Sequence, residues 1–235
     1  MPAGLFVTIV SMGNLYLVRH GQASFGAADY DNLSELGQRQ SVRLGEHFRE
    51  QGQQFDVVLT GTLKRHRQTF AGIAEGMQLG AVEARELPGL NEFDGDAVIR
   101  AIHPEPLQRP TTPDGVRAHF RLLREGIAAW MQGRTAPEGM ISYAAFRAGV
   151  QDAINHVRAE HADADVLIVS SGGPISTAVG LVLGTTPETT IDLNMRMRNS
   201  AVTEFAVTPK RHALITYNTL PHLEAPAYRS WITHA

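Results

Sequence analysis

The sequence predicts an α/β protein, a three-layer α/β/α sandwich with a mainly parallel central sheet and a helical insertion as lid. Two observations predict this class. Short apolar runs alternate with longer segments whose apolar residues recur at helical spacing. The last two apolar runs flank Pro209-Lys210 and are typical of a β-hairpin. We expect a single domain over residues 1–235, with a loose N-terminal extension over 1–13.

The first half of the chain alternates strand and helix patterns. Residues 14–18 form a continuous apolar run, which is typical of a parallel strand buried on both faces. Ser34 precedes a helical pattern that places Leu44 and Phe48 on one apolar face. The patterns that follow predict a strand over 55–59, a helix over 62–77 and a strand over 82–87.

The second half begins with a change of character over 94–140, where prolines cluster and the strand pattern stops. We expect this insertion to contain a helix over 116–131 and to form a lid over the ligand site. The remaining predicted elements are an amphipathic helix through Phe146 and Val150, a strand over 166–169, a helix from Pro174, and hairpin strands over 201–207 and 213–217.

Composition excludes several classes of function. The formal net charge is −3 with no basic block, so neither nucleic acid nor a membrane is an expected partner. The chain has no cysteine, which excludes disulfides and cysteine-ligated metals and fits a cytoplasmic location. The histidine spacing predicts no metal site, and no apolar run reaches the roughly 20 residues of a membrane span. The sequence determines neither whether Met1 or Met12 starts the protein nor its oligomeric state, so a homo-oligomer stays open.

Polar residues follow three of the predicted strands, at the sheet edge where α/β proteins usually bind ligands. Arg19 and His20 follow the first strand, and Gly21 then lets the backbone turn sharply or approach a ligand closely. Arg65 follows the second strand near a helix start, and Glu92 lies in a loop after the third. Arginines together with helix N-terminal amides suit a phosphoryl group, so we expect an anion site at this edge.

Four motifs in this order resemble the histidine phosphatase superfamily, also called the phosphoglycerate mutase-like family. They are LYLVRHG, TLKRHRQT, LNEFDG and IVSSGGPI, and the segments LSELGQRQ and NSAVTEF extend the resemblance over nearly the whole chain. Arg-His-Gly is weak evidence by itself, but Leu-x-Arg-x-x-Gln-Thr over 63–69 makes the combination specific. The resemblance implies a metal-independent phosphomonoesterase that needs no cofactor and acts on a small phosphorylated metabolite.

The resemblance also implies roles for individual residues. His20 corresponds to the nucleophile, which forms a phosphohistidine that water then hydrolyses. Arg19 and Arg65 correspond to the arginines that hold the phosphoryl oxygens, and Glu92 corresponds to the general acid. Arg67 is two residues along the same helix from Arg65 and is expected on the surface. The candidate contacts that neighbour these residues in the motifs are Gly21, Gln22 and Gly172.

The chain departs from the family pattern after the strand over 166–169. The family usually has Ser-His-Gly-Gly there, so Ser171 stands where a second phosphate-binding histidine is expected. Serine can donate a hydrogen bond but lacks the charge and reach of histidine. His66 and His222 are the candidates to fill that gap. The rival interpretation of Ser171 as a serine nucleophile requires Gly-x-Ser-x-Gly, which is absent from 167–176.

A second departure is Gly26, where many members, the mutases especially, have asparagine. The extended mutase segment after Arg-His-Gly and the Glu-Arg-His-Tyr-Gly run around the acid are also absent from the sequence. These differences favour phosphatase over mutase activity. Because of Ser171, reduced activity and a non-catalytic, phospho-ligand-binding role stay open as alternatives. A protein-phosphohistidine phosphatase is a third reading, although this chain is longer than the compact members with that activity.

Overall fold

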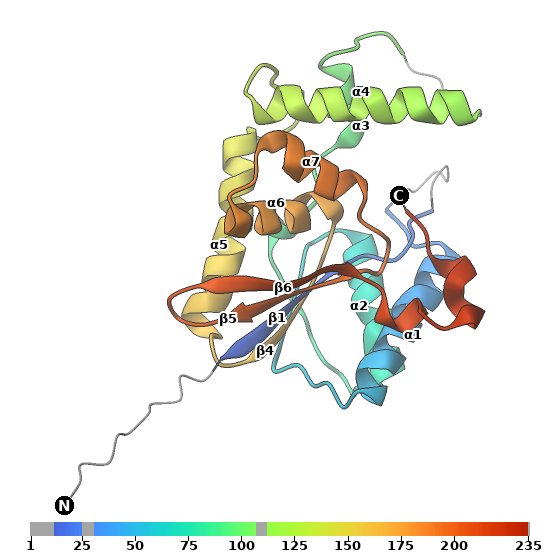
Figure 1. Cartoon of the computed structure of the whole chain (residues 1–235), viewed down its shortest axis with the longest axis vertical. Coiled ribbons are helices and arrows are strands. Elements are labelled where there is room, and N and C mark those ends of the chain that lie inside the picture. Colours follow the sequence, from blue (N-terminus) through green and yellow to red (C-terminus); the bar gives the residue numbers. More distant parts are fainter. Residues whose placement is uncertain (1–11, 25–30, 107–111, 235) are drawn as a thin grey trace, which may run out of the picture.

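The computed structural model describes residues 12–24, 31–106 and 112–234 (Figure 1). The expected loose extension over 1–13 falls almost wholly outside these residues, and so do the departure at Gly26 and part of the proline-rich insertion, 107–111. Gly13 is already the first residue of strand β1, where it pairs with Val207.

The central sheet confirms the predicted α/β class. Over the described residues it has six strands in the order β3-β2-β4-β1-β5-β6. The first four run parallel to one another, and the C-terminal hairpin adds the two antiparallel pairings, as expected. The strands are β1 (Gly13–Arg19), β2 (Val57–Thr60), β3 (Arg85–Glu86), β4 (Asp165–Ser170), β5 (Val202–Val207) and β6 (His212–Thr219).

Helices cover both faces of this sheet and complete the three layers (Figure 1). The α-helices are α1 (Glu35–Glu50), α2 (Lys64–Met77), α3 (Gly95–Arg100), α4 (Pro113–Met131), α5 (Tyr143–Glu160), α6 (Gly172–Leu183) and α7 (Pro187–Met195). Short 3₁₀ segments are η1 (Pro88–Leu90), η2 (Pro221–Leu223) and η3 (Pro226–Trp231). Helices α1 and α2 pack on one face of the sheet, and α5 and α6 pack on the other.

Consecutive residues of the central strands point into opposite cores. Leu17 of β1 and Ile168 of β4 pack with α5 and α6, whereas Val18 and Leu167 pack with α1 and α2. Both faces are covered, so these strands need continuous apolar runs rather than alternating ones. Their carboxyl ends therefore leave the core together, which is where the polar motif residues begin.

Helices α1 and α2 approach each other through glycines. A Cβ atom on Gly45 would lie 2.1 Å from the carbonyl O of Ile73, and one on Gly76 would lie 2.0 Å from that of Val42. The two helices can pack this closely only because no side chain stands between their backbones at these points. This contact fixes α2, and with it the start of the helix that carries Arg65.

The expected insertion contains α3 and α4, which pack together beyond the main body of the sheet (Figure 1). Trp130 near the end of α4 is fully buried, and its ring centroid lies 5.4 Å from those of Phe93 and Phe146. The opposite end of α4 exposes Val116 and Phe120. That this insertion covers the ligand site stays a prediction.

Several elements differ from the sequence prediction, and helix α3 and the three 3₁₀ segments are among those not predicted. The strand expected over 82–87 forms only as β3, because this edge strand pairs with β2 alone and its two residues are exposed. Helix α7 was not predicted, although its signals are in the sequence. Thr186 accepts the N–H of Thr189 as N-cap, and Pro187 occupies the first turn.

We predict that Gly76→Ala destabilises the protein by roughly 1–3 kcal/mol, because the new methyl group collides with the backbone of α1. Gly80→Ala is the matched control, since no atom lies within 4 Å of a Cβ there. Urea unfolding of both variants measures the difference. Equal free energies of unfolding would show that the two helices do not need the glycine contact.

Candidate active site

The carboxyl ends of β1 and β4 bring the first and fourth motifs together. Arg19 pairs with Ser170 at the end of the parallel ladder, and the backbone N–H of His20 donates to the carbonyl O of Ser170 over 2.9 Å. Strand β2 lies on the other side of β4, so the start of α2 reaches the same edge. The predicted meeting of the strand ends is therefore observed.

His20 is buried and held in one tautomer. Its Nδ1 lies 2.7 Å from the carbonyl O of Gly21, which can only accept, so Nδ1 carries the proton and donates it. The lone pair of a neutral ring is then on Nε2. Burial, followed by the charges of Arg19 and Arg65, holds the pKa of His20 well below 6.5. The imidazole is therefore neutral near pH 7, as a nucleophile requires.

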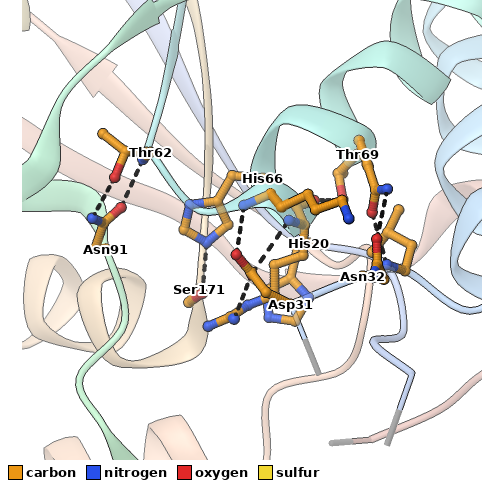
Figure 2. A network of polar contacts seen from close by, with 12 residues as sticks. His20, Asp31, Asn32, Thr62, His66, Thr69, Asn91 and Ser171 are labelled. Carbon is orange, nitrogen blue, oxygen red and sulfur yellow. Dashed lines mark hydrogen bonds and ion pairs between the residues drawn. The ribbon is translucent and has the colours of Figure 1, made fainter. Parts of the chain in front are cut away.

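Arg65 is anchored by a carboxylate that the sequence analysis did not single out. Its guanidinium donates to Asp31 over 2.9 Å, and the backbone N–H groups of Lys64 and Arg65 donate to the same carboxylate at 2.8 and 3.4 Å (Figure 2). The N-cap of α2 is Leu63, which has no side-chain acceptor. Asp31 supplies that acceptor from another segment. A leucine at the N-cap position was the signal in the sequence that an acceptor from elsewhere in the chain is needed.

Arg19 is also fixed by the backbone, since its guanidinium donates to the carbonyl O of Met197. By contrast, Arg67 is about half-exposed and pairs with Glu86 over 3.2 Å, in agreement with its expected surface position. Arg19 and Arg65 are both buried and both act on the pKa of His20. These are the two arginines that the motifs indicate.

Glu92 bonds to the start of helix α6. One carboxylate oxygen accepts the N–H of Gly173 over 3.0 Å, and the other accepts the N–H of Phe93 over 3.2 Å. A Cβ on Gly173 would lie 2.1 Å from the carboxylate, so only glycine admits this contact. Burial raises the pKa of Glu92, against the opposing effects of Gly173, Arg65 and Arg19. A carboxyl with a raised pKa can act as a general acid closer to neutral pH.

The loop that carries Glu92 is tied to two strand ends. The hydroxyl of Ser170 donates to the carbonyl O of Leu90 over 2.7 Å. The Asn91 amide accepts the Thr62 N–H and donates to the Thr62 hydroxyl, both over 2.7 Å (Figure 2). The sequence analysis did not identify Asn91, because its partner is 29 residues away.

Ser171 contacts His66, one of the two histidines considered as candidates for the gap. The Ser171 hydroxyl lies 2.7 Å from Nε2 of His66, and both residues are fully buried (Figure 2). The ring centroid of His66 is 5.9 Å from that of His20. Burial, then the charges of Arg65 and Arg67, lowers the pKa of His66 to about 3.

His222 lies elsewhere, behind the His20 backbone. Its Nε2 is 2.9 Å from the Ser200 hydroxyl, and the Ser200 N–H donates to the carbonyl O of His20 over 3.2 Å.

Two hydrogen bonds hold the loop that follows His20. The Gln22 side chain accepts a hydrogen bond from the Ser34 hydroxyl over 2.9 Å, which connects this loop to the start of α1. Gly21 donates its N–H to Thr69 over 3.0 Å, which joins that loop to α2.

The remaining candidate contact, Gly172, begins α6, where a Cβ would lie 2.3 Å from the Asn194 side chain. Within the described part of the chain, no group of three or more His, Cys, Asp or Glu residues could hold a metal ion. In the same residues no helix is long and apolar enough to cross a membrane.

Comparisons with known proteins place this site in context. The family model "Histidine phosphatase superfamily (branch 1)" matches residues 15–220. A 2,3-bisphosphoglycerate-dependent phosphoglycerate mutase of Methylorubrum extorquens is 36% identical over 86 residues, 34% of this chain and 41% of that protein. A broad-specificity phosphatase of Saccharomyces cerevisiae is 30% identical over 84 residues, 33% of this chain and 36% of that protein. The chain thus matches less than half the length of these curated relatives.

Solved structures share the fold over nearly their whole length. Phosphoserine phosphatase of Entamoeba histolytica, in complex with 3-phosphoglyceric acid, has a TM-score of 0.64 at 19% identity, covering 90% of this chain and 99% of that one. A mycobacterial glucosyl-3-phosphoglycerate phosphatase has a TM-score of 0.61 at 21% identity, covering 88% and 99%. At these identities the likeness concerns the fold.

Acid should destabilise the protein through its buried histidines. A folded-state pKa of about 3 for His222, against an ordinary 6.5, means that only the unfolded chain binds this proton between those values. The stabilisation is complete above pH 6.5 and declines as the pH falls towards 3, by up to about 1.4 kcal/mol per pH unit. His222→Gln should make the pH dependence of the free energy of unfolding shallower by about that amount between pH 5.5 and 4. Above pH 7 the two curves should run parallel. An unchanged slope at acid pH would contradict the assignment.

Proposed function

Because the chain belongs to the histidine phosphatase superfamily (branch 1), we propose that it is a metal-independent phosphomonoesterase that acts through a phosphohistidine on a small phosphorylated metabolite. The observation that carries the proposal is the state of His20. Its Nδ1 proton is committed to Gly21, so the Nε2 lone pair belongs to a buried, neutral ring beside two arginines. Relatives named as phosphatases of phosphoserine and of glucosyl-3-phosphoglycerate support the substrate class.

In the first step the Nε2 lone pair of His20 attacks phosphorus while the ester P–O bond breaks. Glu92 in its protonated form gives its proton to the leaving oxygen, so an alcohol departs. The bond between Nδ1–H and Gly21 offsets the positive charge on the phosphorylated ring. Arg19 and Arg65 hold the equatorial oxygens, which carry charge through a loose transition state.

In the second step water attacks phosphorus and the N–P bond breaks. The Glu92 carboxylate takes a proton from the water, which restores the acid for the next cycle. His20 returns to the neutral ring and inorganic phosphate leaves. Relatives include mutases as well as phosphatases. Hydrolysis is favoured here because the chain lacks the extended mutase segment after Arg-His-Gly.

The contact between Ser171 and His66 favours one alternative to a fully active phosphatase. Neither the serine hydroxyl nor the neutral ring of His66 brings positive charge to the phosphoryl group. The alternative proposal is therefore a weakly active or non-catalytic member that binds a phosphorylated ligand. Turnover in the presence of a chelator separates the two proposals.

The direct test is to trap the intermediate. Brief incubation with ³²P-labelled substrate and EDTA, followed by an alkaline quench, should leave an acid-labile label on His20, because phosphoramidates hydrolyse in acid. His20→Ala should abolish both the label and the hydrolysis of an aryl phosphate. An acid-stable label on Ser171 would exclude the histidine mechanism, and binding of phosphate without any turnover would favour the alternative.

Glu92→Gln should separate two kinds of substrate. An alkoxide leaving group needs a proton, so kcat/KM for alkyl phosphates should fall by roughly 10²–10⁴, whereas aryl phosphates should be nearly unaffected. The amide oxygen still accepts the Gly173 N–H, so the start of α6 stays bonded. The raised pKa of Glu92 should also extend alkyl phosphatase activity to higher pH than an ordinary glutamic acid allows. An equal loss for both substrates would indicate a structural role for Glu92.

A further inference from the structure

Two buried side chains that can form hydrogen bonds meet beside His20 from distant parts of the chain. His66 lies in the first turn of α2, and Ser171 lies at the N-cap of α6, 105 residues further on. Nε2 of the ring and the hydroxyl oxygen are 2.7 Å apart, and neither residue is exposed. Figure 2 shows the ring of His66 directed at Ser171, and the ring centroid of His20 lies 5.9 Å from that of His66.

Ser171 does not do what an N-cap serine usually does. Such a hydroxyl normally accepts the N–H of the second or third residue of its helix. Here the hydroxyl makes no capping bond, and the N–H of Gly173 donates to Glu92 instead. The Ser171 hydroxyl is therefore not used by its own helix and can bond to His66 instead.

The space around His66 is fitted to its ring. A Cβ on Gly61 would lie 2.3 Å from Nδ1 of His66, so glycine at 61 is required for the observed position. Nδ1 is buried and has no hydrogen-bond partner among the described residues. A proton on Nδ1 would be a buried, unpaired N–H, which is rare in folded proteins because its lost hydrogen bond to water is not replaced. The proton therefore belongs on Nε2, where Ser171 accepts it.

This tautomer determines the direction of the Ser171 hydroxyl. A serine oxygen that accepts from Nε2–H keeps its own proton for a third group. We propose that His66 is a positioning residue, which holds the Ser171 hydroxyl so that it donates to the phosphoryl group transferred to His20. The inference rests on the proposed function and adds to it an uncharged two-residue donor. Such a donor supplies direction without positive charge, and Arg19 and Arg65 supply the charge.

The test compares two amides at position 66. In His66→Gln the amide nitrogen can occupy the place of Nε2 and still donate to Ser171, whereas the shorter side chain of His66→Asn ends near the place of Nδ1. We expect Ser171→Ala and His66→Asn each to lower kcat/KM for an aryl phosphate by about 10². His66→Gln should stay within about tenfold of the parent. Similar losses for Gln and Asn, or a greater loss for Gln, would overturn the proposal.

A double-mutant cycle tests whether the two residues act as one unit. The variant with both His66→Asn and Ser171→Ala should be no slower than Ser171→Ala, because the serine is the group that touches the phosphate. His222→Asn is the matched control, since that histidine is equally buried and also bonds to a serine. The fold-loss in activity caused by His222→Asn should multiply with the fold-loss caused by Ser171→Ala, as expected for two residues that act independently. If the fold-losses of His66→Asn and Ser171→Ala also multiply in the double variant, the proposal is contradicted.

Affinity for inorganic phosphate separates this inference from the proposed function. If the parent protein turns over no phosphate ester, the proposed enzyme activity fails, but the Kd for phosphate still reports the donor. Ser171→Ala and His66→Asn should each weaken phosphate binding by about tenfold, and His66→Gln should restore most of it. Unchanged affinity in all three variants would show that the Ser171 hydroxyl does not reach the anion.

Discussion

The backbone N–H of His20 donates to the carbonyl O of Ser170, which continues the parallel pairing of β1 and β4 one residue beyond the strands. This bond places His20 beside Ser171 at the start of α6. Because β4 lies between β1 and β2, the helix that follows β2 begins over the same strand end. The order of three parallel strands thus brings together His20, Arg65 and Ser171 from three motifs.

Burial and positive charge then determine the protonation of the site. Desolvation opposes the charged form of every ionisable group, and Arg19 and Arg65 oppose a further positive charge on His20. The same burial raises the pKa of Glu92, although hydrogen bonds and the arginines act against it. Buried sites that share the same two arginines therefore hold a neutral base and a carboxyl that can keep a proton. The proposed reaction needs these two states together.

The region around Ser171 is fitted closely. Gly173 admits the Glu92 carboxylate, Gly61 admits the ring of His66, and the Ser171 hydroxyl contacts that ring. His66 from α2 lies within hydrogen-bond distance of the Ser171 hydroxyl, which is the arrangement that the proposed donor needs.

The sequence by itself determined the features that depend on neighbouring residues, namely buried strands, helix starts and short motifs. Continuous apolar runs predicted β1 and β4, Ser34 predicted the start of α1, and the motifs indicated His20, Arg65 and Glu92. Helix α7 was missed although its Thr-Pro start is a local signal, and the strand over 82–87 was overestimated because exposure at a sheet edge is not a local property.

Only the tertiary structure decided which side chains complete the site. The carboxylate of Asp31 reaches the first turn of α2 from a segment more than 30 residues away, and His66 meets Ser171 across 105 residues. Helical periodicity alone predicts that neighbours such as Arg65 and His66 point in different directions. Both contact the site because the first turn of α2 lies over the end of β4. Arg65 can therefore bond to Asp31 while the adjacent His66 meets Ser171. Strand order sets that arrangement, and no local pattern in the sequence encodes it.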